Sequence, residues 1–129
     1  MGYKEDRRAR ALALYEQMGW GENESVKEAD EELWKIITDI MFGEIWARPG
    51  LSLRDKEMVT LAALIMDKAE GMTLHMRHAH KLGITFDEMR EVIFQVMYYA
   101  GQAKGLFAVR CLKRVMQETG AKFTPRDDK

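Results

Sequence analysis

Apolar residues recur at helical spacing along most of the chain, and the strict alternation of a half-buried strand is nowhere sustained. The pattern predicts about six helices, ended mainly by glycine and by the Pro49-Gly50 pair. Their approximate ranges are 5–18, 27–45, 52–69, 72–82, Thr85 to about residue 100, and a last helix that follows a break at Gly101–Gly105 and runs to Gly120. The fold class predicted is all-α.

Two helix starts carry capping signals. Ser52, with Asp55 three residues later, caps the third helix, and Thr85 with Glu88 forms a capping box for the fifth. Helical spacing also predicts which side chains face inward. In the first helix these are Leu12, Tyr15 and Met18; in the second, Leu33, Ile36, Ile37, Ile40 and Met41; in the fifth, Met89, Val92, Ile93, Val96 and Ala100.

The third helix differs because its middle, 58–66, is apolar nearly all the way round. A surface helix shows a polar face, so this one is expected to be buried centrally or between subunits.

The chain has the length of one ordinary domain, and no linker or repeat divides its 129 residues. We therefore expect a single domain over 1–129 with a frayed tail at 122–129. Basic and acidic side chains number 20 and 21 and are interspersed, which argues against a nucleic-acid partner. The longest apolar run, 61–66, is too short to cross a bilayer. One cysteine, Cys111, and a charged N-terminus without a signal-peptide core predict a cytoplasmic protein.

All three histidines lie within Thr73–His80. His75 and His78 share a helical face, but no third ligand and no HExxH pattern accompany them, so no metal site is expected. His78 and His80 alternate with basic residues, which favours solvated or interfacial positions. His75 follows Leu74 near the start of its helix, and histidine is the commonest general acid or base. From the residues alone, His75 is either catalytic or an ordinary structural residue.

Six further segments follow one another in order along the chain. They are Phe42–Leu51 (FGEIWARPGL), Val59–Leu64 (VTLAAL), Leu74–Ala79 (LHMRHA), Gly83–Thr85 (GIT), Glu88–Val92 (EMREV) and Gln95–Gly101 (QVMYYAG). In this order and spacing they resemble the γ-carboxymuconolactone decarboxylase family over roughly 32–118.

The resemblance implies a compact alkylhydroperoxidase D-like helical protomer that assembles into a ring homo-oligomer, a hexamer or alternatively a trimer. It implies removal of CO₂ from 4-carboxymuconolactone, a small carboxylic acid of aromatic catabolism, to give the enol-lactone of 3-oxoadipate. The unsaturated lactone accepts the electrons itself, so no cofactor is expected. The thiol-dependent branch of the clan carries two cysteines ahead of the histidine, and the matching positions here are Lys68 and Gly71. A thiol peroxidase is therefore disfavoured, unless Cys111 proves exposed and reactive.

The matching residues suggest roles in such a reaction. His75 is the expected proton donor or shuttle, and Glu44 is expected to orient its imidazole or to be an N-terminal or surface salt-bridge carboxylate. Arg48 is expected to bind a substrate carboxylate or to form a structural ion pair. Trp46 is expected to form a pocket wall or to be plain core. Arg77 is expected to contact substrate or to reach a neighbouring subunit. Gln95 and Tyr99 share a helical face and are further substrate-binding candidates.

One segment departs from the family pattern. Where the family has a small apolar residue, proline, alanines and asparagine, residues 102–107 read QAKGLF, which adds Lys104 and Phe107. This leaves open a lyase or isomerase for another small carboxylic acid, and an oligomeric binding protein with a degenerate site.

Overall fold

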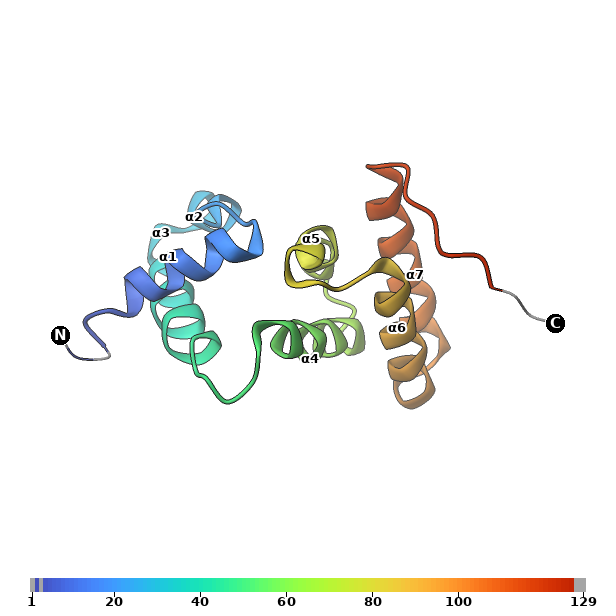
Figure 1. Cartoon of the computed structure of the whole chain (residues 1–129), viewed down its shortest axis with the longest axis horizontal. Coiled ribbons are helices and arrows are strands. Elements are labelled where there is room, and N and C mark those ends of the chain that lie inside the picture. The colour runs from blue at the N-terminus through green and yellow to red at the C-terminus, as the bar shows by residue number, and fades with distance from the viewer. Residues whose placement is uncertain (1, 3, 127–129) are drawn as a thin grey trace. The chain divides into compact units, whose positions relative to one another are not determined.

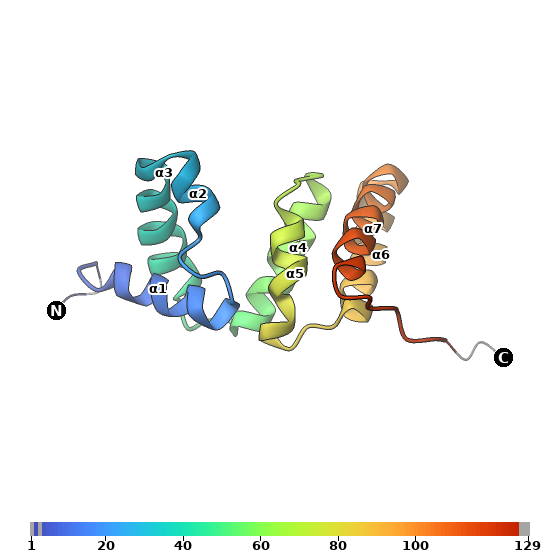
Figure 2. The same ribbon diagram turned by 90° about the horizontal axis from the view of Figure 1, so that it is seen from above.

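The computed structural model describes residue 2 and residues 4–126, and every regular element in that part of the chain is helical (Figures 1 and 2). The predicted all-helical class is confirmed. The elements are α1 (Arg7–Met18), α2 (Glu24–Ala29), α3 (Glu31–Ile36), the π-helix η1 (Ile37–Trp46), α4 (Leu53–Met66), α5 (Met72–His78), the 3₁₀ helix η2 (Ala79–Leu82), α6 (Phe86–Ala100) and α7 (Gln102–Gln117).

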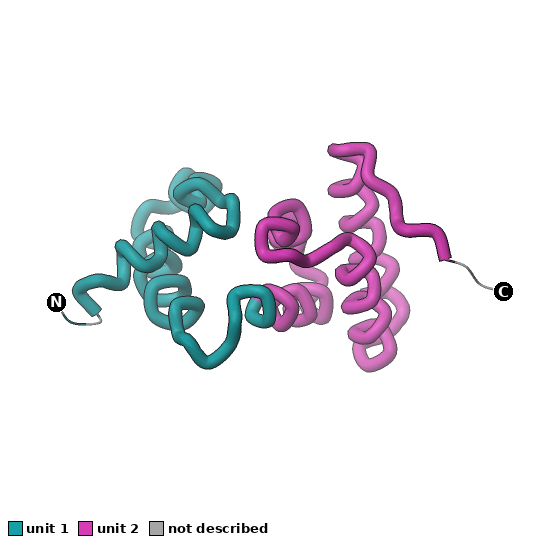
Figure 3. Tube along the Cα trace, in the orientation of Figure 1, with its two compact units in different colours: residues 1–56 teal, residues 57–129 magenta. Residues whose placement is uncertain are grey.

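The chain forms two compact units, residues 1–56 and 57–129 (Figure 3). Each has its own buried core and is described by itself. Within the described residues, no helix is long and apolar enough to cross a membrane.

The first unit is built on the packing of α1 against η1. Its core is aromatic: the Phe42 ring lies 4.9 Å from Tyr15, 5.3 Å from Trp20 and 5.3 Å from Trp46, measured between ring centroids. Gly43 allows the close approach, because a Cβ there would lie 2.3 Å from the backbone oxygen of Arg7. A side chain at this position would force the two helices apart.

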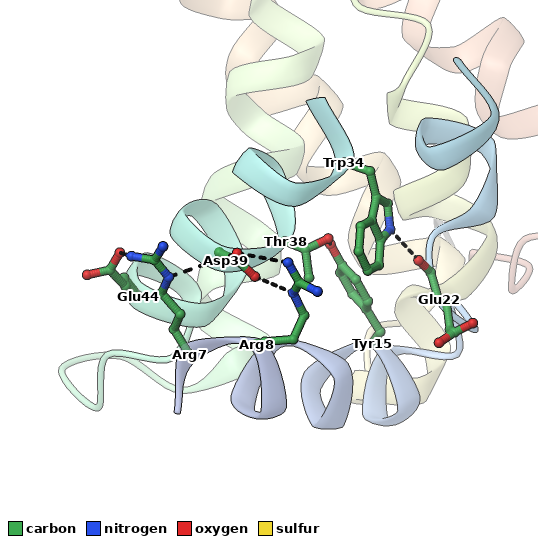
Figure 4. Close-up of polar contacts among 8 residues, drawn as sticks. All are labelled: Arg7, Arg8, Tyr15, Glu22, Trp34, Thr38, Asp39 and Glu44. Atoms are coloured by element: carbon green, nitrogen blue, oxygen red, sulfur yellow. Dashed lines mark hydrogen bonds and ion pairs between the residues drawn. The ribbon is translucent and has the colours of Figure 1, made fainter. Parts of the chain in front are cut away.

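Polar contacts fix the same pair of helices (Figure 4). The Arg8 guanidinium forms a two-pronged contact with Asp39, with one N–H···O distance of 2.9 Å. The Tyr15 hydroxyl lies 2.9 Å from the Thr38 hydroxyl in the buried core. The hydroxyl pair satisfies two polar groups that would be costly to bury without a partner.

The prediction of one helix over 27–45 is wrong in two respects. Asp30 has an extended backbone that ends α2, and its side chain accepts from the Leu33 amide at 2.9 Å to cap α3. The helix then continues as a π-helix and ends at Trp46, before Pro49-Gly50.

The inward face of this region was also mispredicted. Leu33, Ile36, Ile40 and Met41 are exposed, whereas Trp34, Thr38, Phe42 and Trp46 are buried. The buried residues repeat every four positions, which a turn wider than 3.6 residues keeps on one face. The larger rings, together with the Thr38 hydroxyl that bonds to Tyr15, occupy the core in place of the aliphatic stripe.

The second unit pairs α6 with α7, which lie side by side in both views (Figures 1 and 2), and α5 packs on α7. Its core comes mainly from the inner faces of these helices and of α4. The capping box predicted at Thr85 and Glu88 is present. In contrast to the predicted break at Gly101–Gly105, Gly105 lies inside α7, where a Cβ would come within 2.4 Å of the Met97 sulfur.

Helix α4 begins with the predicted cap, in which the Asp55 amide donates to the Ser52 hydroxyl at 3.1 Å. It is not buried all round within the protomer: Glu57, Leu61 and Ile65 form the buried face, while Val59 is 61% exposed.

Residues 121–126 have no regular secondary structure, and 127–129 of the tail predicted to be frayed lie outside the described residues. The Thr124 amide and hydroxyl both donate to the Asp87 carboxylate, at 3.0 and 2.6 Å.

Candidate active site

A buried carboxylate contacts the histidine that the sequence singles out. Oε1 of Glu57 lies 2.6 Å from Nδ1 of His75. The Glu57 residue is 1% exposed, and the His75 side chain retains 13% of its accessible surface. The carboxylate is therefore shielded from solvent, whereas the imidazole side chain is only partly exposed.

Local sequence explains how the second unit presents these two side chains. Glu57 lies on the same face of α4 as Leu61 and Ile65, one and two turns away, so packing of those aliphatic side chains draws the carboxylate inward. Met72 and Met76 anchor α5 in the core, and His75 precedes Met76 at the edge of that face. A buried carboxylate without a partner is costly, and the imidazole supplies one.

The arrangement has a definite chemical capacity. When Nδ1 carries its hydrogen and donates it to Glu57, the carboxylate fixes the tautomer and the ring orientation. In that tautomer Nε2 is the ring nitrogen that can accept a proton. Glu57 also stabilises the imidazolium that forms when the ring takes up a proton.

Sequence reasoning missed Glu57. The signal that could have identified it is a lone acid at position i of an otherwise apolar i, i+4, i+8 row, formed with Leu61 and Ile65. An acid on a buried face requires a partner, and a histidine on a following helix is a natural one.

The carboxylate proposed for this task, Glu44, belongs to the first unit. Its Oε2 accepts from an Arg7 nitrogen at 3.3 Å, and the same contact is drawn in Figure 4. Trp46 is buried and stacks on Phe42, as plain core does.

The two arginines differ in their surroundings. Arg48 is exposed and follows the end of η1; its backbone oxygen accepts from the Lys56 ammonium. Arg77 forms a bidentate ion pair with Glu118, at 2.8 and 2.9 Å, on the surface of the second unit. The Glu118 carboxylate raises the pKa of Arg77 above its usual value.

Gln95 and Tyr99 both lie exposed on α6, and Tyr99 is 74% accessible. Gln95 borders an open, mainly apolar groove of about 500 Å³ between α4 and α6. The groove is lined by Met58, Val59, Ala62, Glu88, Glu91, Val92, Gln95 and Val96.

The remaining histidines do not join the pair. Nδ1 of His80 lies 3.2 Å from the backbone oxygen of Arg77, and His80 is exposed. Burial, followed by the nearby Arg77 charge, holds the pKa of His78 below its usual value. In the described residues, no three histidine, cysteine or acidic side chains gather as metal ligands would.

Cys111 is fully buried in the core of the second unit. The thiol-peroxidase alternative requires an exposed, reactive thiol, and the buried Cys111 does not supply one. In the segment that departs from the family pattern, the Phe107 ring packs against the core. The Lys68 ammonium lies 5.1 Å from the centroid of that ring.

A model of the carboxymuconolactone decarboxylase family matches residues 31–114. The chain belongs to this family. The matched range contains both Glu57 and His75, and it confirms the resemblance expected over 32–118.

Two curated relatives of this family member are decarboxylases by name. The chain is 27% identical to a 4-carboxymuconolactone decarboxylase of Acinetobacter baylyi over 119 residues, which cover 92% of this chain and 89% of the relative. It is 35% identical to a nitrosuccinic acid decarboxylase of Metarhizium robertsii over 68 residues, 52% of this chain and 48% of the relative. The two names support carboxy-lyase activity in general for this chain.

Proposed function

We propose that this protein is a cofactor-independent decarboxylase of a small carboxylic acid that contains its own electron sink. 4-Carboxymuconolactone is the first candidate substrate, with the enol-lactone of 3-oxoadipate as product and aromatic catabolism in the cytoplasm as the setting. The observation that carries the proposal is the 2.6 Å contact between His75 and buried Glu57.

The reaction needs one proton at one carbon. The bond between the carboxylate carbon and its neighbour breaks, CO₂ leaves, and the electron pair enters the conjugated lactone as an enolate. The imidazolium of His75 then delivers its Nε2 proton to carbon, and solvent restores that proton. Glu57 holds the ring through Nδ1 and balances its positive charge while the carbanion is present.

The relatives' names narrow the substrate class. A carboxymuconolactone and a nitrosuccinic acid each carry two carboxyl groups and one strongly electron-accepting group, a lactone in one case and a nitro group in the other. Each delocalises a carbanion without pyridoxal, thiamine or metal. We therefore include a nitro-activated dicarboxylic acid as the second candidate, favoured by the 35% identical relative.

A dicarboxylate substrate needs a cation that binds the carboxylate retained in the product. Arg48 remains our candidate for that task, because it is exposed and guanidinium pairs with carboxylate in a bidentate manner.

A homo-oligomer, in the form of a ring, is part of the proposal. Apolar side chains remain exposed in both units, among them Ile36 and Ile45 in the first and Val59 and Met66 in the second. Such surfaces are typical of interaction sites. Sedimentation of a stable monomer at micromolar concentration would contradict this part.

The deciding experiment measures CO₂ release, and loss of ultraviolet absorbance for the lactone, with 4-carboxymuconolactone and with 2-nitrosuccinate in parallel. We expect turnover of at least one substrate and its loss in His75→Ala. Turnover of the nitro acid alone would move the assignment to the second candidate. Failure of both, with folded and assembled protein, would leave a lyase or isomerase for another small carboxylic acid and the binding-protein alternative.

A further inference from the structure

The ammonium group of Lys56 is surrounded by backbone carbonyls at the end of η1. Lys56 lies in the first turn of α4, and its Nζ is 2.6 Å from the Trp46 oxygen and 3.3 Å from the Ile45 oxygen. It also donates to the carbonyl of Arg48. The three hydrogens of an ammonium thus match three acceptors, all within the first unit.

These carbonyls are suitable partners for a cation. The last carbonyls of a helix have no partner within it and carry the negative end of the helix dipole. After Trp46 the chain turns, with the Arg48 amide donating to the Ile45 oxygen at 3.2 Å, and then meets Pro49. The Lys56 side chain donates to carbonyls of this turn and so links the turn to the start of α4.

The turn carries an exposed guanidinium. Among the residues that the structure describes, none forms an ion pair with Arg48. The charge of Arg48 nevertheless acts on Lys56: burial first, and then the Arg48 charge, hold the pKa of Lys56 below its usual value. The carbonyls compensate the Lys56 charge, whereas the exposed Arg48 guanidinium has donors that can pair with an anion from outside the unit.

We propose that Lys56 is a positioning residue, which holds the carbonyls of the Ile45–Arg48 turn so that the Arg48 guanidinium binds a substrate carboxylate. In this proposal, the identity of the substrate rests on the proposed function. The contacts by which Lys56 holds the turn do not depend on it. Lys56 acts through the backbone that carries Arg48 and does not itself touch substrate.

The test compares Lys56→Met, which keeps the length of the side chain and removes the cation, with Lys56→Arg and with the control Lys113→Met at an exposed position of α7. Amide hydrogen exchange of the 46–52 segment reports on the turn. NMR shifts of Arg48 on addition of succinate report on carboxylate binding. Both are measured whether or not turnover is found, so failure of the proposed function can be distinguished from failure of this one.

We expect Lys56→Met to speed exchange in 46–52, to weaken succinate binding and to raise KM about tenfold, with kcat changed by less than about threefold. Lys56→Arg should recover part of each loss, and Lys113→Met should behave as wild type. If Lys56→Met fails to fold, Lys56→Gln replaces it, because the amide keeps two donors without the charge. If Lys56→Met exchanges faster but leaves succinate binding and KM unchanged, Lys56 is a structural residue and the proposal is overturned. Unchanged amide exchange in 46–52 would also overturn it.

Discussion

Glu57 and His75 are 18 positions apart in sequence, and a 2.6 Å contact joins their side chains within the second unit. If His75 delivers the proton in the slow step, His75→Ala should lower kcat on the order of 10²–10⁴-fold. Added imidazole should restore part of the rate, which a purely structural histidine would not show. His80→Ala is the matched control, because His80 is exposed and lies outside the pair. Wild-type rates in His75→Ala would assign His75 a structural role.

The carboxylate can be tested separately from the imidazole. Glu57→Gln keeps the shape but removes the charge that stabilises imidazolium, so kcat should fall by at least about tenfold. Glu44→Gln discriminates between the two acids, because Glu44 contacts Arg7 in the first unit. The exposed Glu70→Gln serves as control. If Glu44→Gln lowered kcat and Glu57→Gln did not, Glu44 would be the residue that orients the His75 imidazole. Circular dichroism must show that each variant is folded.

The buried hydroxyl pair in the first unit predicts non-additive stability. Thr38→Val leaves the Tyr15 hydroxyl buried without its partner, and should cost about 1–3 kcal/mol in unfolding free energy. Tyr15→Phe with Thr38→Val removes both groups and should cost less than the sum of the single changes. Urea unfolding of Thr38→Val, of Tyr15→Phe and of the double variant measures the three free energies. Strict additivity would show that the hydroxyls do not interact.

The Arg8–Asp39 contact predicts a pH dependence. The Arg8 guanidinium holds the pKa of Asp39 below its usual value, so its stabilisation is complete above the unfolded-state pKa of about 3.9. It is lost as the pH falls through the lower folded-state value. Asp39→Asn should therefore cost about 1 kcal/mol at pH 7, and the difference from wild type should shrink near pH 3. Asp67→Asn, at an exposed position, should show no such trend.

Gly43 should tolerate no side chain. Alanine gains about 1 kcal/mol of helix propensity over glycine, but its Cβ at 2.3 Å from the Arg7 oxygen meets backbone that cannot rotate away. We expect a net loss of about 2 kcal/mol or more in unfolding free energy. Gly71→Ala is the control, since nothing lies within 4 Å of a Cβ there. Equal stability of the two variants would contradict the close approach of α1 and η1.

Local signals in the sequence were sufficient for the all-helical class, for several helix ends and for the family. Ser52 and Thr85 cap helices as predicted, because a cap depends on a side chain and amides two or three residues away. Gly19 and Gly83 have the left-handed backbone that ends a helix. The ordered segments from Phe42 to Gly101 were enough to identify the family, since their spacing is itself a property of the sequence.

Tertiary packing decided which faces are buried and which side chains meet. Helical periodicity selected the Leu33–Met41 aliphatic stripe. Instead, the buried Phe42 ring packs against Tyr15 of α1 and Trp46 stacks on Phe42, and both rings belong to the π-helix. The spacing of Glu57 with Leu61 and Ile65 marks an acid on a buried face, but its contact with His75 depends on how α4 and α5 pack and not on either helix alone. The sequence by itself determined the all-helical class, the caps at Ser52 and Thr85 and the candidate histidine. Only the folded second unit selected Glu57, since burying a carboxylate is tolerable only where packing brings it a hydrogen-bond partner.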